Sequence, residues 1–323
     1  GRPARCHRHP PSPSPHPGGR GLSPVQHLAL VGTTASGKSA VAHALAREAG
    51  DIEICSVDSM QVYRGMDIGT AKPSSAERAE VRYHLLDLAE PDHDFTLAEF
   101  QAGMAAALAE IEDRGHRALL VGGTALYLRA VVDGLTLPPP YPEVRAELEA
   151  EPDTGALHAR LVALDPVGAT RMEPTNRRRV VRALEVTIGS GRPFSAHGPG
   201  LGEHPPTPFR LVGLWLPREV VAARIRARYE RQVAEGFVDE VAALLARPGG
   251  LSRTARQALG YRQLIRHVED GTSLADAVTA AVNRTTRFAR RQRSWFRRDH
   301  RIQWVGHPEN PLAVLPTLLR DWR

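Results

Sequence analysis

Cysteines and long apolar runs are both scarce in this sequence, and their scarcity excludes whole classes of protein. Only two cysteines occur among 323 residues, Cys6 and Cys55, too few for a disulfide framework or a cysteine metal cluster. No apolar run approaches the roughly 20 residues of a membrane-spanning helix, and the N-terminus shows no apolar signal core. We therefore expect two free thiols in a cytoplasmic protein with no membrane partner.

Residues 1–24 contain almost nothing apolar and are rich in Pro, Ser, Gly and His. Such a segment cannot bury enough surface to offset its ordering entropy. We expect a disordered, Pro-rich leader. The rest of the chain is suited to a folded core, because 42% of all residues are hydrophobic.

Positive charge is the main excess in the composition. The formal net charge is +6, which favours an anionic partner such as nucleic acid without requiring one. Two clusters in helix-compatible stretches hold much of this charge. They comprise Arg177, Arg178, Arg179 and Arg182, and then Arg284, Arg287, Arg290, Arg291, Arg293, Arg297 and Arg298. Neither cluster shows the interleaved carboxylates that are typical of a purely solvent-facing helix.

A glycine-rich motif follows the first apolar run of the chain. The run covers residues 26–32, and residues 39–49 then show helical periodicity. Between them the sequence fits G-x-x-x-x-G-K-[ST], a P-loop whose backbone N–H groups surround phosphate oxygens. Its residues are Gly32, Thr33, Thr34, Ala35, Ser36, Gly37, Lys38 and Ser39. We expect Lys38 to neutralise a terminal phosphate and Ser39 to bind Mg²⁺.

Strand-like and helical stretches alternate along the chain. Apolar runs at residues 52–57 and 117–121 end at Asp58 and Gly122, and Thr96 with Glu99 forms a capping box for a helix between them. This order predicts an α/β fold: a P-loop NTPase-like, three-layer parallel sheet with ligands at the carboxyl ends of its strands.

Three consecutive prolines at residues 138–140 interrupt the alternation. From there to residue 208 the patterns are helical with no convincing strand, so we expect a helical insertion over residues 136–208. Residues 25–135 and 209–323 would then form the core. A strand at residues 209–216 resumes the sheet, helices follow, and residues 302–305 are expected as an edge strand.

The P-loop alone does not name a reaction, because hydrolases, kinases and group transferases share it. Asp58 ends a strand and faces the ligand side of the sheet, where it could bind magnesium, accept a proton or simply make a turn. Residues 58–73, however, closely resemble the signature of the tRNA dimethylallyltransferase family. Further matches in the same order are residues 32–39, 83–87, 122–127, 179–185, 260–263 and 287–296, so the resemblance spans residues 28–304.

The resemblance implies transfer of a dimethylallyl group from dimethylallyl pyrophosphate to N6 of the adenine 3′ to the tRNA anticodon. It implies Asp58 as the general base, Thr124 across the reaction channel, and either Arg224 or Arg228 on the pyrophosphate with Mg²⁺. It also implies contacts with the anticodon stem-loop and a monomeric enzyme. The implied tRNA contacts are Asp58, Ser59, Met60, Gln61, Thr124, Arg145, Arg178, Arg179, Val180, Val181 and Arg182.

Two departures from the family pattern and three alternatives accompany this interpretation. Thr33 replaces the usual proline, and Arg178 replaces a usual glutamine, which exchanges a neutral hydrogen-bonding group for a charge. An isopentenyltransferase acting on free AMP or ATP would leave the arginine clusters without a use. A small-molecule kinase would need an arginine-bearing lid. A non-enzymatic RNA-binding module would leave the P-loop and Asp58 unexplained.

Overall fold

Six parallel strands form the central sheet of the computed structural model, which describes residues 27–198, 202–307 and 309–322. In sequence they are β1 (Leu28–Gly32), β2 (Ile52–Val57), β3 (Tyr83–His84), β4 (Arg117–Gly122), β5 (Arg210–Trp215) and β6 (Gln303–Gly306). In space their order is β3-β2-β4-β1-β5-β6. All ladders are parallel, so the carboxyl ends of β1, β2 and β4 lie at one edge of the sheet, side by side.

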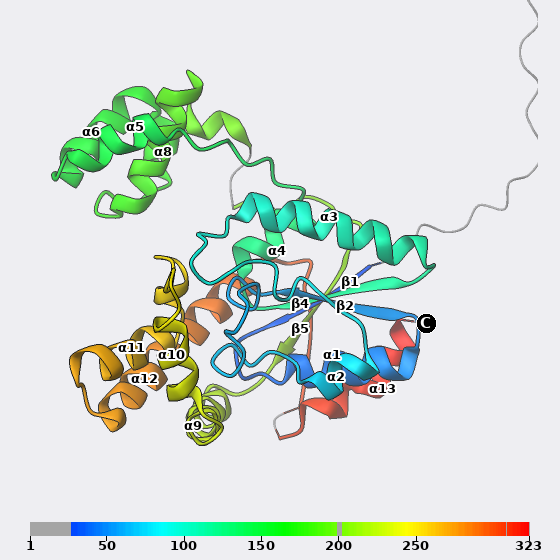
Figure 1. Ribbon diagram of the computed structural model, residues 1–323. Helices are drawn as coiled ribbons and strands as arrows, with labels where there is room; N and C mark the ends of the chain where they lie inside the picture. The colour runs from blue at the N-terminus through cyan, green and yellow to red at the C-terminus, as the bar shows by residue number, and fades with distance from the viewer. Residues whose placement is uncertain (1–26, 199–201, 308, 323) are drawn as a thin grey trace, which may run out of the picture.

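Helices cover both faces of this sheet, as β1 makes clear. Leu28 and Leu30 point into an apolar cluster with α1 (Lys38–Ala49) and α13 (Leu315–Asp321). Ala29 and Val31 point into the opposite cluster, with α3 (Leu97–Asp113) and α4 (Ala125–Val132). Figure 1 shows the sheet between these helix layers. The predicted three-layer α/β fold is confirmed, and so is the capping box of Thr96 and Glu99 that starts α3.

The second half of the chain adds a helical group beside the sheet. It comprises α9 (Arg218–Ala234), α10 (Phe237–Leu245), η2 (Ala255–Gln257), α11 (Tyr261–Asp270) and α12 (Leu274–Phe296). Side chains of all five join the larger apolar cluster. The remaining short helices of the core are α2 (Ser75–Glu80) and η3 (Pro311–Val314).

The segment between β4 and β5 folds as helices around an apolar cluster of its own. Its helices are α5 (Pro142–Ala150), α6 (Thr154–Leu164), α7 (Pro166–Thr170), α8 (Arg177–Ser190) and η1 (Phe194–His197). In Figure 1 they lie apart from the sheet, beyond α3 and α4. The chain leaves and re-enters the core at adjacent points, because the Thr207 hydroxyl donates to the Val132 carbonyl at 2.5 Å.

The predicted strands are present with their ends shifted by one or two residues, and β6 pairs only with β5 as an edge strand should. The sequence analysis missed β3, because two residues show no periodicity. Cys55 is a buried free thiol, as expected. Residues 1–24, Cys6 among them, lie outside the described part of the chain. No helix of the described ranges is long and apolar enough to cross a membrane.

Candidate active site

The P-loop joins β1 to α1 at the centre of the sheet. Gly37, directly before α1, has φ 90°, and an added Cβ would lie 2.5 Å from Pro311 Cγ. A side chain at this position is therefore excluded by both its backbone conformation and the close approach of η3. The turn forms although Thr33 stands where the family usually has proline. The Ser36 N–H donates to the Thr33 carbonyl at 3.2 Å.

Lys38 reaches back over this loop, with Nζ donating to the Thr33 carbonyl at 3.4 Å. Burial lowers the pKa of Lys38 to about 8; nearby Asp58 opposes this decrease, and Arg228 adds to it. The three charged groups therefore lie close enough to influence one another. An anion bound here would favour the protonated lysine.

Arg228 of α9 hydrogen-bonds to the P-loop, and Arg224 lies beside it, since a Cβ added at Gly37 would be 3.5 Å from Arg224 Nη1. Arg228 Nη1 donates to the Thr34 hydroxyl at 3.1 Å, whereas Arg224 Nη2 donates to the Glu309 carbonyl at 3.0 Å. Arg228 Nε and Ser36 Oγ are both buried and have no hydrogen-bond partner within the described chain. Buried polar groups are normally paired, so these two atoms are the ones that a bound phosphate would satisfy.

Asp58 follows β2 and lies opposite Lys38. One carboxylate oxygen accepts the Met60 N–H at 2.9 Å in a local turn. Gln61, one of the implied tRNA contacts, uses its amide inside the loop. Its Oε1 accepts from the Ser56 hydroxyl at 2.6 Å, and its Nε2 donates to the carbonyls of Thr70 and Ala71. Gln61 therefore shapes the loop that carries Asp58.

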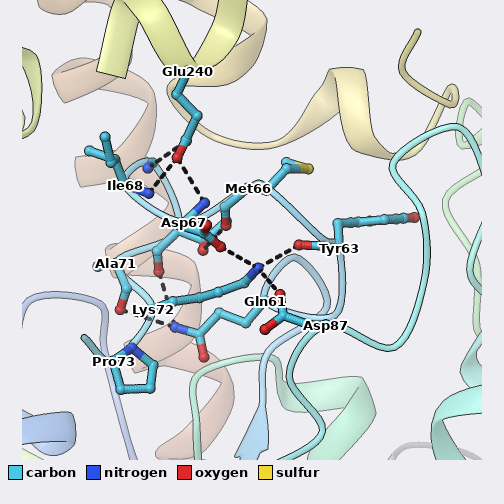
Figure 2. Close-up of polar contacts among 12 residues, drawn as sticks. Gln61, Tyr63, Met66, Asp67, Ile68, Ala71, Lys72, Pro73, Asp87 and Glu240 are labelled. Carbon is cyan, nitrogen blue, oxygen red and sulfur yellow. Dashed lines mark hydrogen bonds and ion pairs between the residues drawn. The ribbon is translucent and has the colours of Figure 1, made fainter. Parts of the chain in front are cut away.

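The rest of this loop is fixed by two charged side chains, Lys72 and Glu240, which Figure 2 shows. Lys72 Nζ donates to the Tyr63 carbonyl and to the carboxylates of Asp67 and Asp87, with its side chain 1% exposed. Glu240 of α10 accepts the backbone N–H groups of three consecutive residues, 67–69. The sequence analysis did not single out Glu240, since one acidic residue in a first helical turn carries no distinguishing signal.

The ends of β2 and β4 approach each other closely. An added Cβ on Gly122 would lie 2.1 Å from the Val57 carbonyl oxygen, so only glycine fits there. Thr124 follows as the N-cap residue of α4, but its hydroxyl does not cap the helix and stays available to a ligand. Tyr127, one turn further, lies near Asp58, and its pKa is raised to about 12, chiefly by burial.

The predicted tRNA contacts on the insertion include both solvent-exposed residues and residues packed inside the insertion. Arg178 and Arg179 are exposed at the start of α8, and the charge of Arg178 reaches Tyr127 in the core. Val180 and Val181, which we expected to contact tRNA, are buried in the apolar cluster of the insertion. Amphipathic packing of α8 places these side chains inward and the arginines before them outward.

Arg145 and Arg182 converge on Glu185, a carboxylate that is only 1% exposed. Their guanidinium groups lie 3.2 Å and 2.8 Å from its oxygens, and Arg182 also donates to the carbonyls of Pro138 and Pro139. The cluster from Arg177 to Arg182 contains no interleaved carboxylate, as stated above, but Glu185, one turn after Arg182, pairs with it. These two arginines therefore stabilise the segment around Pro138 and Pro139, where the chain enters the insertion.

Arg287, Arg290 and Arg291 on α12, and Arg297 and Arg298 directly after it, are exposed, while Phe296 is buried in the core and Trp295 packs against the core. Trp295 and Phe296 are therefore core anchors. A basic hollow, lined by Arg253, Arg256, Arg262 and Arg266, lies on neighbouring η2 and α11. The sequence analysis missed it because its arginines are spread over fourteen positions with other residues between them.

Strand order, P-loop and the carboxylate after β2 define a P-loop α/β protein with its candidate site at the carboxyl edge of the sheet. The sequence profile of the IPP transferase family matches residues 61–299. The chain belongs to this family. Among its relatives, the tRNA dimethylallyltransferase of Chloroflexus aggregans is 46% identical over 92% of this chain and 97% of its own length. The tRNA dimethylallyltransferase of Kineococcus radiotolerans is 48% identical over 91% of this chain and 96% of its own length.

Solved structures give the same result. The tRNA isopentenylpyrophosphate transferase of Bacillus halodurans is 33% identical, with a TM-score of 0.67 over 92% of this chain and 95% of that one. A eukaryotic dimethylallyltransferase acting on tRNA shares the fold at a TM-score of 0.74 and 23% identity, covering 88% of this chain and 74% of that one.

Proposed function

We propose that this enzyme transfers the dimethylallyl group of dimethylallyl pyrophosphate to N6 of the adenine 3′ to the anticodon in tRNA. The observation that carries the proposal is the meeting of a phosphate cradle with a carboxylate: Arg228 donates to the Thr34 hydroxyl of the P-loop, and the charge of Asp58 acts on Lys38 of the same loop. The family membership and the names of the relatives support the same reaction.

In this reaction a bond forms between N6 and the allylic carbon as the bond from that carbon to pyrophosphate breaks. Negative charge then develops on the leaving pyrophosphate, where the P-loop N–H groups, Lys38 and Arg228 would stabilise it. The Thr34 hydroxyl, already bound to Arg228, faces the same position. Asp58 would accept the proton that N6 loses, and Thr124 would help to align the base.

We expect Mg²⁺ to bind this site only when the substrate is also bound. Ser39 is exposed in the first turn of α1, and the described residues form no group of three or more His, Cys, Asp or Glu side chains that could hold a metal. The Ser39 hydroxyl would therefore share the ion with phosphate oxygens and water, the ligands that Mg²⁺ prefers. When bound, the ion would supply further positive charge to the leaving group.

The tRNA would lie between the core and the insertion. Arg178 and Arg179 are exposed at the start of α8 and would supply positive charge there, as would the exposed Arg287, Arg290 and Arg291 of α12. Phosphate contacts of this kind position a strand, while the target base leaves its stack to reach the channel. Ser59 and Met60, beside Asp58, would line the base. Arg145 and Arg182 would act by holding the insertion.

Transfer of labelled dimethylallyl pyrophosphate to unmodified tRNA in the presence of Mg²⁺ tests the proposal. The wild-type protein should label tRNA and not AMP. Asp58→Asn, which keeps the turn but removes the base, should lower kcat by about 100-fold or more. Label in AMP alone would indicate a free-nucleotide enzyme. Phosphorylation of a small molecule by ATP, with no prenyl transfer, would indicate a kinase.

A further inference from the structure

Gln292 is a neutral amide within the arginine-rich half of α12, and it is 5% exposed. Its Oε1 accepts the backbone N–H of Thr34 at 2.8 Å, and its Nε2 donates to the Gly123 carbonyl at 2.8 Å. One side chain thus joins the P-loop after β1 to the turn after β4. Both ends of the amide are thus hydrogen-bonded to the backbone of these loops.

The amide joins the two loops beyond the point where the hydrogen bonds of the sheet end. The pairing of β1 with β4 ends at Val31 and Gly122, so strand hydrogen bonds do not reach Thr34 or Thr124. An added Cβ on Gly123 would lie 2.3 Å from Gln292 Nε2 and 3.2 Å from the Gly32 carbonyl oxygen. Because position 123 is glycine, the Gln292 amide can lie in contact with both loops. This contact fixes the distance between the loops.

Both loops carry groups on which the transfer depends. Thr34 accepts a hydrogen bond from Arg228 on the pyrophosphate side, and Thr124 follows Gly123 directly. We propose that Gln292 is a positioning residue. It holds Thr34, and with it Arg228, at a fixed distance from Thr124 on the other side of the reaction channel. This inference rests on the proposed transfer reaction. Because Gln292 lies behind the loops, it should affect alignment in the transition state more than the binding of tRNA.

Gln292→Met tests this inference, with Gln101→Met as the matched control. Gln101 Nε2 donates to the carbonyls of Ala130 and Leu135, so the control also removes two hydrogen bonds but leaves the P-loop alone. We expect Gln292→Met to lower kcat by about 10- to 100-fold and to change KM for tRNA by less than about threefold. The Tm of the two variants should fall alike. Equal kcat values in both variants would overturn the inference.

Gln292→Glu provides a second variant in case the methionine variant does not fold. It keeps the length of the side chain and the acceptor for the Thr34 N–H, but it turns a carboxylate oxygen toward the Gly123 carbonyl. We expect kcat to fall while the protein stays folded by circular dichroism. A wild-type kcat would overturn the inference. If the wild-type protein itself transfers no label, the proposed function fails and this inference fails with it.

Discussion

Two arginines one helical turn apart on α9 have different partners. Arg228 binds the Thr34 hydroxyl of the P-loop, whereas Arg224 binds the backbone carbonyl of Glu309 near η3. Their spacing puts both on one face of the helix, so the sequence could not separate them. In the structure Arg228 is hydrogen-bonded to the P-loop, while Arg224 lies beside Gly37 and donates to Glu309.

At the residue scale, we therefore expect unequal effects from the same substitution. Arg228→Gln should lower kcat for transfer by about 100-fold, because it removes positive charge where negative charge develops. Arg224→Gln should change kcat by less than about threefold. Steady-state kinetics with labelled dimethylallyl pyrophosphate and tRNA measures both. Comparable losses in the two variants would mean that Arg224 also reaches the pyrophosphate.

At the element scale, the loop from β2 to α2 depends on α10 for its shape. Glu240 accepts three consecutive backbone N–H groups of this loop and also the Tyr261 hydroxyl. Gly69 permits this contact, since an added Cβ would lie 2.2 Å from the Phe237 ring. The loop carries Asp58 at its other end, so its docking on α10 links the helical group to the active site (Figure 2).

Glu240→Ala should destabilise the protein by about 2 kcal/mol or more, because several backbone donors lose their only charged acceptor. Urea denaturation gives the free energy of unfolding. Asp239→Ala is the control: Asp239 is exposed in the same first turn of α10, so both variants lose one acidic residue there. A loss in Glu240→Ala no greater than in Asp239→Ala would show that the loop holds its shape without this carboxylate.

At the scale of the whole molecule, the helices of the insertion surround an apolar cluster separate from the two clusters beside the sheet. The hydrogen bond between Thr207 and Val132 keeps both ends of the insertion together. Folding of the core should therefore not require the insertion, whereas tRNA binding should, because Arg178 and Arg179 belong to α8.

Replacing residues 139–201 with a short Gly-Ser linker tests this division. The shortened protein should fold cooperatively and bind inorganic pyrophosphate with an affinity within about threefold of the full chain, as measured by calorimetry. Transfer to tRNA should fall below detection, since a large share of phosphate contacts is lost. Retained transfer would show that the core alone recognises tRNA.

Much of the site could be predicted from sequence because its residues are encoded locally. Gly32 to Ser39 form one continuous loop, and Asp58 and Gly122 each end an apolar run. A parallel sheet places such ends together. The surroundings of Val180 and Gln61 could not be predicted, for the opposite reason. Whether a side chain within a motif faces solvent, the core or its own loop depends on packing partners that lie far away in sequence.

The sequence by itself determined the α/β class, the phosphate loop and the edge of the sheet where the chemistry would take place, since periodicity and glycine motifs are local properties. Only the tertiary structure decided that Arg228 meets Thr34, that Glu240 holds the Asp58 loop, and that Gln292 joins two strand ends. These contacts connect residues between 169 and 258 positions apart. No local pattern specifies them, because the packing of α9, α10 and α12 against the sheet brings the partners together.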